Sequence, residues 1–209
     1  MRPAYELNGD SAPVTSPSGE AGRRPLRADA RRNRERLLQA AAAAFAADGL
    51  SVPLDEIARR AGVGPGTLYR HFPAKEDLFA AVLHDRLQRL ADEARDLRSA
   101  GDPAGALLGF IGRLVTEAAL KRDLADALAR SGLALPGGTE AVAADLRAGI
   151  GHLLTRAQDG GGIRGDVRLA DLMGLIAGTL LAIQARTGAH ADPRVVMAVL
   201  ADGLRAVPG

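Results

Sequence analysis

Apolar residues recur along most of the chain at the three- and four-residue spacing of amphipathic helices, and no stretch alternates as a strand would. β-branched and aromatic residues are sparse, whereas the helix-favouring residues Ala, Leu, Arg and Glu are common. Glycine and proline clusters divide the pattern into segments. We therefore predict an all-α protein with helices at about residues 29–48, 54–61, 65–71, 75–97, 104–120, 121–133, 138–158, 168–187 and 193–206.

A tight turn is expected between the two short helices at 54–61 and 65–71. Gly62 can end the first helix because glycine adopts left-handed backbone conformations freely. Pro65 suits the first turn of the second helix because its missing N–H has no partner there. With the longer helix in front, this arrangement is typical of a helix-turn-helix, whose second short helix enters the major groove of DNA.

The second short helix and the residues after it carry more polar side chains than a core requires. Leu68 and Phe72 are expected to point into the domain. The remaining polar positions are Thr67, Tyr69, Arg70, His71 and Lys75. Hydroxyl, imidazole and ammonium groups suit DNA phosphates, whereas Arg can bridge two guanine acceptors and Thr can touch a thymine methyl group. The alternative is that the tyrosine only packs against the first helix.

Positive charge is concentrated in the same part of the chain. The formal net charge is +2, but residues 23–76 hold 11 Arg and Lys against 6 Asp and Glu, a net +5. A basic segment on a nearly neutral body is expected of a domain that binds a polyanion, although a solvated Arg-rich helix face is the alternative. Residues 1–28, which are rich in Pro, Gly and Ser, are predicted to form a disordered, Arg-containing arm.

The segment LDEIARRAGVGPGTLYRHFPAKEDLFAAV, residues 54–82, closely resembles the DNA-binding signature of TetR-type (tetracycline repressor-like) transcriptional regulators. The matching elements are Ile-Ala, Ala-Gly-Val, Gly-Thr-Leu-Tyr, His-Phe and Lys-Glu-x-Leu. The segment GGGIRGDVRLADLMGLIAG is similar to the family's approach to its penultimate long helix. The resemblance implies a helix-turn-helix DNA-binding domain at 29–77 and a helical ligand-binding and dimerisation domain at 78–209.

The resemblance also implies roles for individual positions. The family's phosphate contacts fall on Tyr69, His71 and Lys75. Its groove-reading positions fall on Pro65, Gly66, Thr67 and Arg70.

Two positions depart from the family pattern. Gly64 replaces the usual Ser before the recognition helix, and Pro53-Leu54 replaces the polar cap often found at the preceding helix. Two of the groove-reading positions also lack a side-chain donor, so base readout rests on fewer residues than usual. We expect the arm to compensate by reaching into a groove, as basic arms can, through Arg23, Arg24 and Arg27.

The segment from Leu172 to Ile183 is apolar almost all round and far too short to span a membrane. Such a helix must be covered on two sides. The stripe predicted to face the monomer core is Leu172, Ile176, Thr179 and Ile183. The stripe of mostly small residues predicted to face a two-fold partner is Gly174, Gly178, Leu181 and Ala185. The last helix is predicted to complete a four-helix dimer interface with Val196, Leu200 and Leu204. The alternative is a single monomeric bundle.

A ligand cavity in the second domain would be lined mainly by aliphatic residues. Of the four Phe, Phe45 and Phe72 are assigned to the DNA-binding core, which leaves Phe79 and Phe110 for the larger domain. The residues we expect to line the cavity are Phe110, Thr116, His152, Met173, Ile176 and Thr179. For each polar member, a surface position or a satisfied hydrogen bond in the core is the alternative.

Catalysis is poorly supported by the sequence. The chain has no Cys, and its four His are scattered without metal-ligand spacing, so we expect neither a metal site nor a cofactor. The segment GVGPG follows a predicted helix rather than a strand, which excludes a nucleotide-binding loop. No signal peptide or transmembrane run is recognisable, and a cytoplasmic protein is expected.

The function predicted from these features is a DNA-binding transcriptional regulator and not an enzyme. The resemblance implies a homodimeric repressor that leaves a palindromic operator when a small molecule binds. Two alternatives remain open at this point. One is a helical ligand-binding or adaptor protein without a DNA function, and the other is a ligand-independent activator or global regulator.

Overall fold

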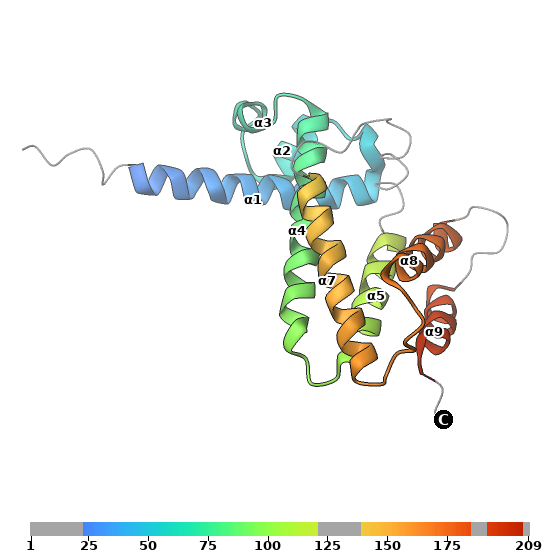
Figure 1. Ribbon diagram of the computed structural model, residues 1–209. Helices are drawn as coiled ribbons and strands as arrows, with labels where there is room; N and C mark the ends of the chain where they lie inside the picture. Colours follow the sequence, from blue (N-terminus) through green and yellow to red (C-terminus); the bar gives the residue numbers. More distant parts are fainter. Residues whose placement is uncertain (1–22, 121–138, 185–191, 207–209) are drawn as a thin grey trace, which may run out of the picture.

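The computed structural model describes residues 23–120, 139–184 and 192–206 (Figure 1). Within these ranges every regular element is a helix, apart from one isolated bridge between Ile163 and Arg205. The α-helices are α1 (Arg23–Asp48), α2 (Leu54–Ala61), α3 (Pro65–His71), α4 (Lys75–Asp96), α5 (Pro103–Leu120), α7 (Thr139–Asp159), α8 (Leu169–Gln184) and α9 (Pro193–Leu204). The all-α prediction is confirmed, and the helix predicted at 121–133 lies outside the described residues.

The start of α1 corrects the predicted arm. The helix begins at Arg23 instead of residue 29, so Arg24 and Arg27 also belong to it. Arg, Leu and Ala all favour helices, and Pro25 falls in the first turn, where its missing N–H has no helical partner to lose. Residues 1–22, the rest of the predicted arm, lie outside the described residues.

The N-terminal core is formed by α1, α2, α3 and the first turns of α4. Its buried members are Leu37, Leu38, Ala41, Ala44, Phe45, Val52, Ile57, Ala58, Ala61, Val63, Leu68, Phe72, Leu78, Phe79 and Val82. The assignment of Phe79 to the larger domain was therefore wrong. Its ring packs edge-on against that of Phe45, with 5.9 Å between the centroids. The N-terminal core extends past residue 77 because α4 continues without a break through both cores.

The C-terminal core is formed by the second half of α4 together with α5, α7, α8 and α9. Leu90, Ala91 and Ala94 of α4 belong to it. Figure 1 shows α4 and α7 side by side, and Gly149 of α7 makes their close approach possible. A Cβ at this glycine would lie 2.9 Å from the Cβ of Ala94, closer than such atoms pack. The helix that carries the N-terminal core is thus tightly packed into the second domain.

Polar contacts also fix the far end of α4. The Arg113 guanidinium on α5 donates to Glu93 Oε1 at 2.7 Å. Arg156 on α7 donates to the carbonyl oxygens of Arg98 and Ala100, which directly follow α4. A displacement of α5 or α7 would therefore act on α4. In the part of the chain that is described, no helix is long and apolar enough to cross a membrane.

Candidate nucleic-acid interface

The turn between α2 and α3 has the geometry that the glycines predicted. Gly62 adopts left-handed backbone angles, φ 63° and ψ 37°, and its N–H bonds to carbonyls of the last turn of α2. The carbonyl of Gly64 then accepts the N–H of Thr67 at 2.9 Å and that of Leu68 at 3.2 Å, which starts α3. A residue with a Cβ is disfavoured at position 62 because L-residues avoid this conformation. The backbone itself therefore fixes the angle at which α3 leaves the domain.

The faces of α3 divide as the sequence predicted. Leu68 is completely buried, whereas Tyr69 is 45% exposed and Arg70 is exposed. Pro65 and Gly66 at the start of the helix are exposed, and a Cβ on Gly66 would meet no atom within 4 Å apart from its own helix backbone and chain neighbours. The first turn of α3 can therefore approach a ligand with its backbone.

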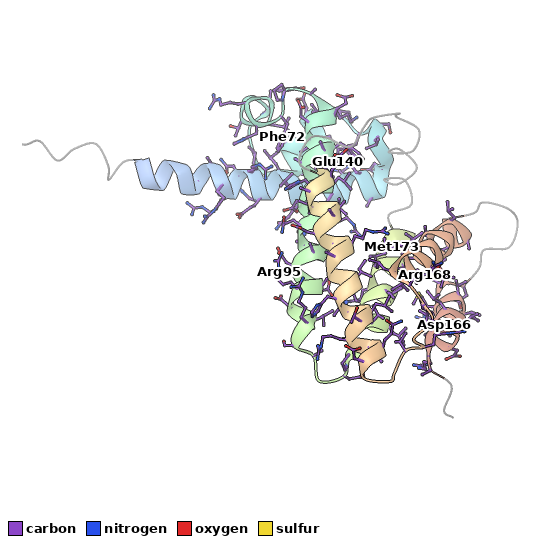
Figure 2. All side chains as sticks on the ribbon, viewed as in Figure 1. Phe72, Arg95, Glu140, Asp166, Arg168 and Met173 are labelled. Carbon is purple, nitrogen blue, oxygen red and sulfur yellow. The ribbon has the colours of Figure 1, made fainter. Side chains whose placement is uncertain are left out.

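The remaining predicted DNA contacts lie beside these residues. Thr67, His71 and Lys75 are each half-buried. Phe72, labelled in Figure 2 where α3 ends, is buried between His71 and the start of α4. Lys75 is the first residue of α4, whose N-terminal backbone is capped by Asp77: the Ala74 N–H donates to its carboxylate at 3.0 Å. The hydrogen-bond donors of His71, at the end of α3, and Lys75, at the start of α4, therefore border the exposed face of α3.

Asp55, in the first turn of α2, is a neighbour of Tyr69 that the sequence did not single out. Its negative charge, together with partial desolvation and a hydrogen bond to Asp55, raises the pKa of the Tyr69 hydroxyl. The hydroxyl thus keeps its proton and can donate. The Tyr69 hydroxyl is therefore a neutral hydrogen-bond donor beside a carboxylate, and a phosphate that accepts from this hydroxyl would replace Asp55 as its partner.

Ion pairs join the first turn of α2 to its last turn and to the end of α1. Glu56 accepts from Arg59 at 2.7 Å and from Arg60 at 2.8 Å, and Arg60 also reaches Asp48 at the end of α1 at 2.7 Å. Hydrogen bonds from Arg59 and Arg60 lower the pKa of the Glu56 carboxyl to about 2. When its carboxylates are ionised, this network therefore links α2 to the end of α1.

Acid should weaken this network in a defined pH range. Because the pKa of Glu56 is lower in the folded protein than in the unfolded chain, its contribution to stability is complete above about pH 4.5 and is lost as the pH falls towards about 2. We expect Glu56→Gln to reduce stability at pH 6 but to make little difference at pH 2, measured by urea unfolding. Glu76→Gln, on the exposed side of α4, is the matched control. A wild-type–variant difference that is the same at both pH values would contradict this.

The structure does not bring all of the predicted ligand-binding residues together. Phe110 and Ile176 are buried in the C-terminal core, and Met173, labelled on α8 in Figure 2, packs against that core. His152 is exposed on α7, because its neighbours Leu153 and Leu154 take the buried positions of that turn; it does not join the others. The side chain of Thr116 lies outside the described residues. No group of three or more His, Asp or Glu side chains in the described ranges is placed to hold a metal ion.

Thr179 belongs to a groove between α8 and α9. The groove has a volume of about 380 Å³, and its lining is mostly apolar. The lining residues are Arg164, Val167, Leu175, Thr179, Val196, Val199, Leu200, Gly203 and Leu204. The structure thus brings a residue predicted to bind ligand together with three predicted to form the dimer interface.

The two predicted faces of α8 are distinct. Leu172, Ile176, Thr179 and Ile183 are all buried, which confirms the core stripe. On the other stripe, Leu181 is 68% exposed, and a Cβ built on Gly174 or Gly178 would meet no atom within 4 Å apart from its own helix backbone and chain neighbours. Ala185 lies outside the described residues. The chain therefore leaves the predicted partner-facing stripe uncovered.

On α9 the predicted interface face is partly wrong. Leu204 is only 2% exposed and packs into the core of its own chain, where its carbonyl accepts the Arg164 N–H at 3.0 Å. The apolar residues that reach solvent are Val195 and Val199, at 59% and 68% exposure, which lie one position away from the predicted set. Their four-residue spacing was a signal in the sequence, but only the packing of α9 decides which of two adjacent apolar stripes is buried.

Comparison with known proteins agrees with both domains. Residues 37–82 match the family model for bacterial regulatory proteins of the tetR family. Residues 102–206 match the model described as the C-terminal domain of SbtR-like transcriptional regulators.

Solved structures extend the similarity over most of the chain. A TetR transcription regulatory protein from Mycobacterium vanbaalenii is 44% identical, with a TM-score of 0.72, over 87% of this chain and 100% of that one. The TetR regulator SCO0520 from Streptomyces coelicolor is 32% identical, with a TM-score of 0.67, over 84% of this chain and 99% of that one.

Among curated proteins the similarity is confined to a shorter segment. The HTH-type transcriptional regulator SrpR of Pseudomonas putida is 44% identical over 64 residues, which is 30% of each protein. The matched segment spans less than half of the length of each of the first curated relatives. The family models and the full-length structural similarity nevertheless agree with the predicted resemblance. The chain belongs to the TetR family of transcriptional regulators, a family of DNA-binding proteins and not of enzymes.

Proposed function

We propose that this protein is a homodimeric repressor that binds a palindromic operator and releases it when a small molecule occupies the C-terminal domain. The DNA-binding part of this proposal is supported by the two faces of α3. Leu68 packs into the core on one face, whereas Tyr69 and Arg70 are exposed on the other. These exposed residues contribute little to stability, so their chemistry is available for a partner. As the target is chromosomal DNA, we place the action of the protein in the cytoplasm.

The residues around α3 suit two kinds of DNA contact. Tyr69, His71 and Lys75 are proposed to donate to phosphates, which positions α3 in the major groove. Arg70 is proposed to read a base edge, with Thr67 beside it. Pro65 and Gly66 are proposed to admit the backbone close to the groove, because both are exposed and Gly66 has no side chain.

The exposed apolar face of α8 and α9 supports the dimer. Four large apolar side chains on these helices reach solvent, namely Leu175, Leu181, Val195 and Val199. Leu175 and Val199 line the same groove, and exposed apolar groups that gather on adjacent helices are typical of protein interfaces. Isologous pairing of this face would give the protein the two-fold symmetry of an operator with half-sites about 34 Å apart.

The helix α4 provides a path for ligand release. Its first turns belong to the N-terminal core and its last turns to the C-terminal core, which also contains Phe110, Ile176 and, at its edge, Met173. A small molecule that separates α4 from α5 or α7 would therefore tilt the helix-turn-helix. Each tenfold loss of operator affinity requires about 1.4 kcal/mol of differential ligand binding between the two states.

The test begins by selecting operators from a random duplex library with the full chain. We expect a symmetric footprint, and we expect Arg70→Ala to cost about 1–3 kcal/mol and to relax specificity at one base pair of each half-site. Arg98→Ala, at the far end of the other domain, is the matched control because it removes the same charge. A folded wild-type protein that selects no sequence would refute the DNA-binding proposal.

A second experiment places the selected operator at a promoter and measures transcription with and without the protein. A decrease in transcription indicates a repressor, and an increase indicates an activator.

A further inference from the structure

The N-terminal half of α1 projects from the protein. Figure 1 shows this part of the helix extending beyond α2, α3 and α4, with no other helix beside it. The described side chains of its outer turns, from Asp29 to Arg36, are exposed except for half-buried Asn33. Arg34 lies 11 residues from the start of α1, so the projecting part is about 16 Å long. The side chains from Asp29 to Arg36 are therefore not part of the N-terminal core, whose first member is Leu37.

The arginines of this projection share one side of the helix. At about 100° per residue, five positions fall within an arc of about 100°, namely Arg23, Arg24, Arg27, Arg31 and Arg34. We call this set the arginine face. Arg32 and Arg36 lie about 160° away from Arg34, on the opposite side, and Asp29 lies there too. No carboxylate falls within this arc, but Glu35 borders it and pairs with Arg31 at 3.7 Å, so the projection has a cationic face with one carboxylate at its edge.

The arginine face continues the buried side of α1. Leu38, Ala41 and Phe45 lie within about 40° of Arg34 around the helix, and all three are buried in the N-terminal core. Where the helix leaves the core, the same side changes from apolar residues to arginine. A mixture of polar residues would be enough to keep this side of the helix soluble. Because arginine alone takes the place of the apolar residues there, we infer that this side meets a polyanion.

Arg34 shows where this face points. Its guanidinium lies over the ring of Phe72, with Cζ 5.7 Å from the ring centroid. Phe72 directly follows α3 and His71, so the arginine face begins at the end of the recognition helix. From there the remaining positions lead away from the N-terminal domain. DNA held by α3 would extend along the same side.

We propose that the arginine face binds the phosphate backbone of the DNA that flanks each half-site. This inference rests on the proposed operator binding and extends it. A helix with side chains is about 10–12 Å wide, whereas the minor groove is about 6 Å wide, so this segment cannot insert there as an extended arm would. Its contacts are to phosphates, and they carry no sequence preference. At 3.4 Å per base pair, 16 Å of helix covers about five base pairs beyond the recognition site.

The first test varies the DNA and leaves the protein unchanged. The wild-type chain is titrated with selected operators that carry about ten flanking base pairs on each side or end at the half-site, across a salt series. Each phosphate contact contributes about 0.9 to the slope of log K against log salt. We expect the trimmed operator to lower that slope by at least 2, because two copies of the arginine face lose their contacts.

The second test uses a matched pair of neighbouring residues. Arg31 and Arg32 are both exposed, and each forms an ion pair within α1, with Glu35 and Asp29 respectively. We expect Arg31→Ala to lower the slope on the long operator by about 1–2 for the dimer and Arg32→Ala to leave it unchanged. On the trimmed operator both variants should match the wild type. Circular dichroism of each variant checks that the helix is retained.

The outcomes separate this inference from the proposed function. Equal slopes on long and trimmed operators, or equal effects of the two substitutions, would overturn the arginine face as a DNA contact while leaving operator binding intact. Failure of the wild-type chain to bind any selected duplex would overturn both. A slope that depends on flank length and on Arg31 but not on Arg32 supports the inference.

Discussion

Replacing Leu181 and Val199 together by aspartate is expected to convert the proposed dimer to monomers. Both side chains are 68% exposed in the single chain, so the change should leave the monomer fold intact. In an isologous dimer each substitution occurs twice, which places four carboxylates in one interface. The effective penalty for burying an unpaired charge is several kcal/mol, so the dimer dissociation constant should rise by more than about 1,000-fold.

The measurement is sedimentation velocity over a concentration series, followed by operator titration. Operator affinity should fall in parallel, because a monomer contacts only one half-site. The matched control is Leu108→Asp on α5, where the leucine is half-buried against the C-terminal core. This change should destabilise the fold itself, whereas the double variant should affect only association. A double variant that remains dimeric would show that α8 and α9 do not form the interface.

Removal of the Phe79 ring is expected to destabilise the N-terminal domain by about 3–5 kcal/mol. Phe79 is 4% exposed, and its ring joins α4 to α1 through the edge-on contact with Phe45. The Phe79→Ala variant would leave a cavity at the place where α4 enters the N-terminal core. Amide hydrogen exchange should therefore accelerate first in α1, α2 and α3.

A comparison with the other domain makes this result specific. Phe110→Ala removes an equally buried ring from the C-terminal core, so its fastest exchange should appear in α5, α7 and α8. Phe79→Leu, which keeps most of the volume, should cost less than about 1.5 kcal/mol. Loss of protection confined to the C-terminal helices in Phe79→Ala would contradict the assignment of this residue to the N-terminal core.

Much of the DNA-binding domain could be predicted because its signals are local. The left-handed backbone at Gly62 and the exclusion of Pro73 from a helix act within a few residues, so the ends of α2 and α3 agree with the prediction. The alternation of buried Leu68 with exposed Tyr69 follows from helical spacing alone. Asp55, whose charge acts on the Tyr69 hydroxyl, was missed because it is 14 positions away in the sequence.

The faces of α1 and α9 could not be predicted in the same way. On α9 the adjacent stripes through Val195 and through Val196 are both apolar, and the contacts of Leu204 with the chain near Arg164 decide which is buried. Residues 23–28 of α1 were expected to be part of a disordered arm, whereas residues 29–48 were expected to be helical. The helical form of residues 23–28 is what aligns the positions of Arg23, Arg24 and Arg27 with those of Arg31 and Arg34.

The sequence by itself determined the helical fold, the helix-turn-helix and the family, because helix periodicity, glycine turns and the motif at 54–82 depend on neighbouring residues. Only the tertiary structure decided that Phe79 belongs to the N-terminal core, that His152 faces solvent and that Leu204 is buried in its own chain. Each of these depends on which helices pack together, and packing joins residues that are far apart in the chain. An apolar or polar pattern shows that a helix has two faces, but the neighbouring helices decide what each face meets.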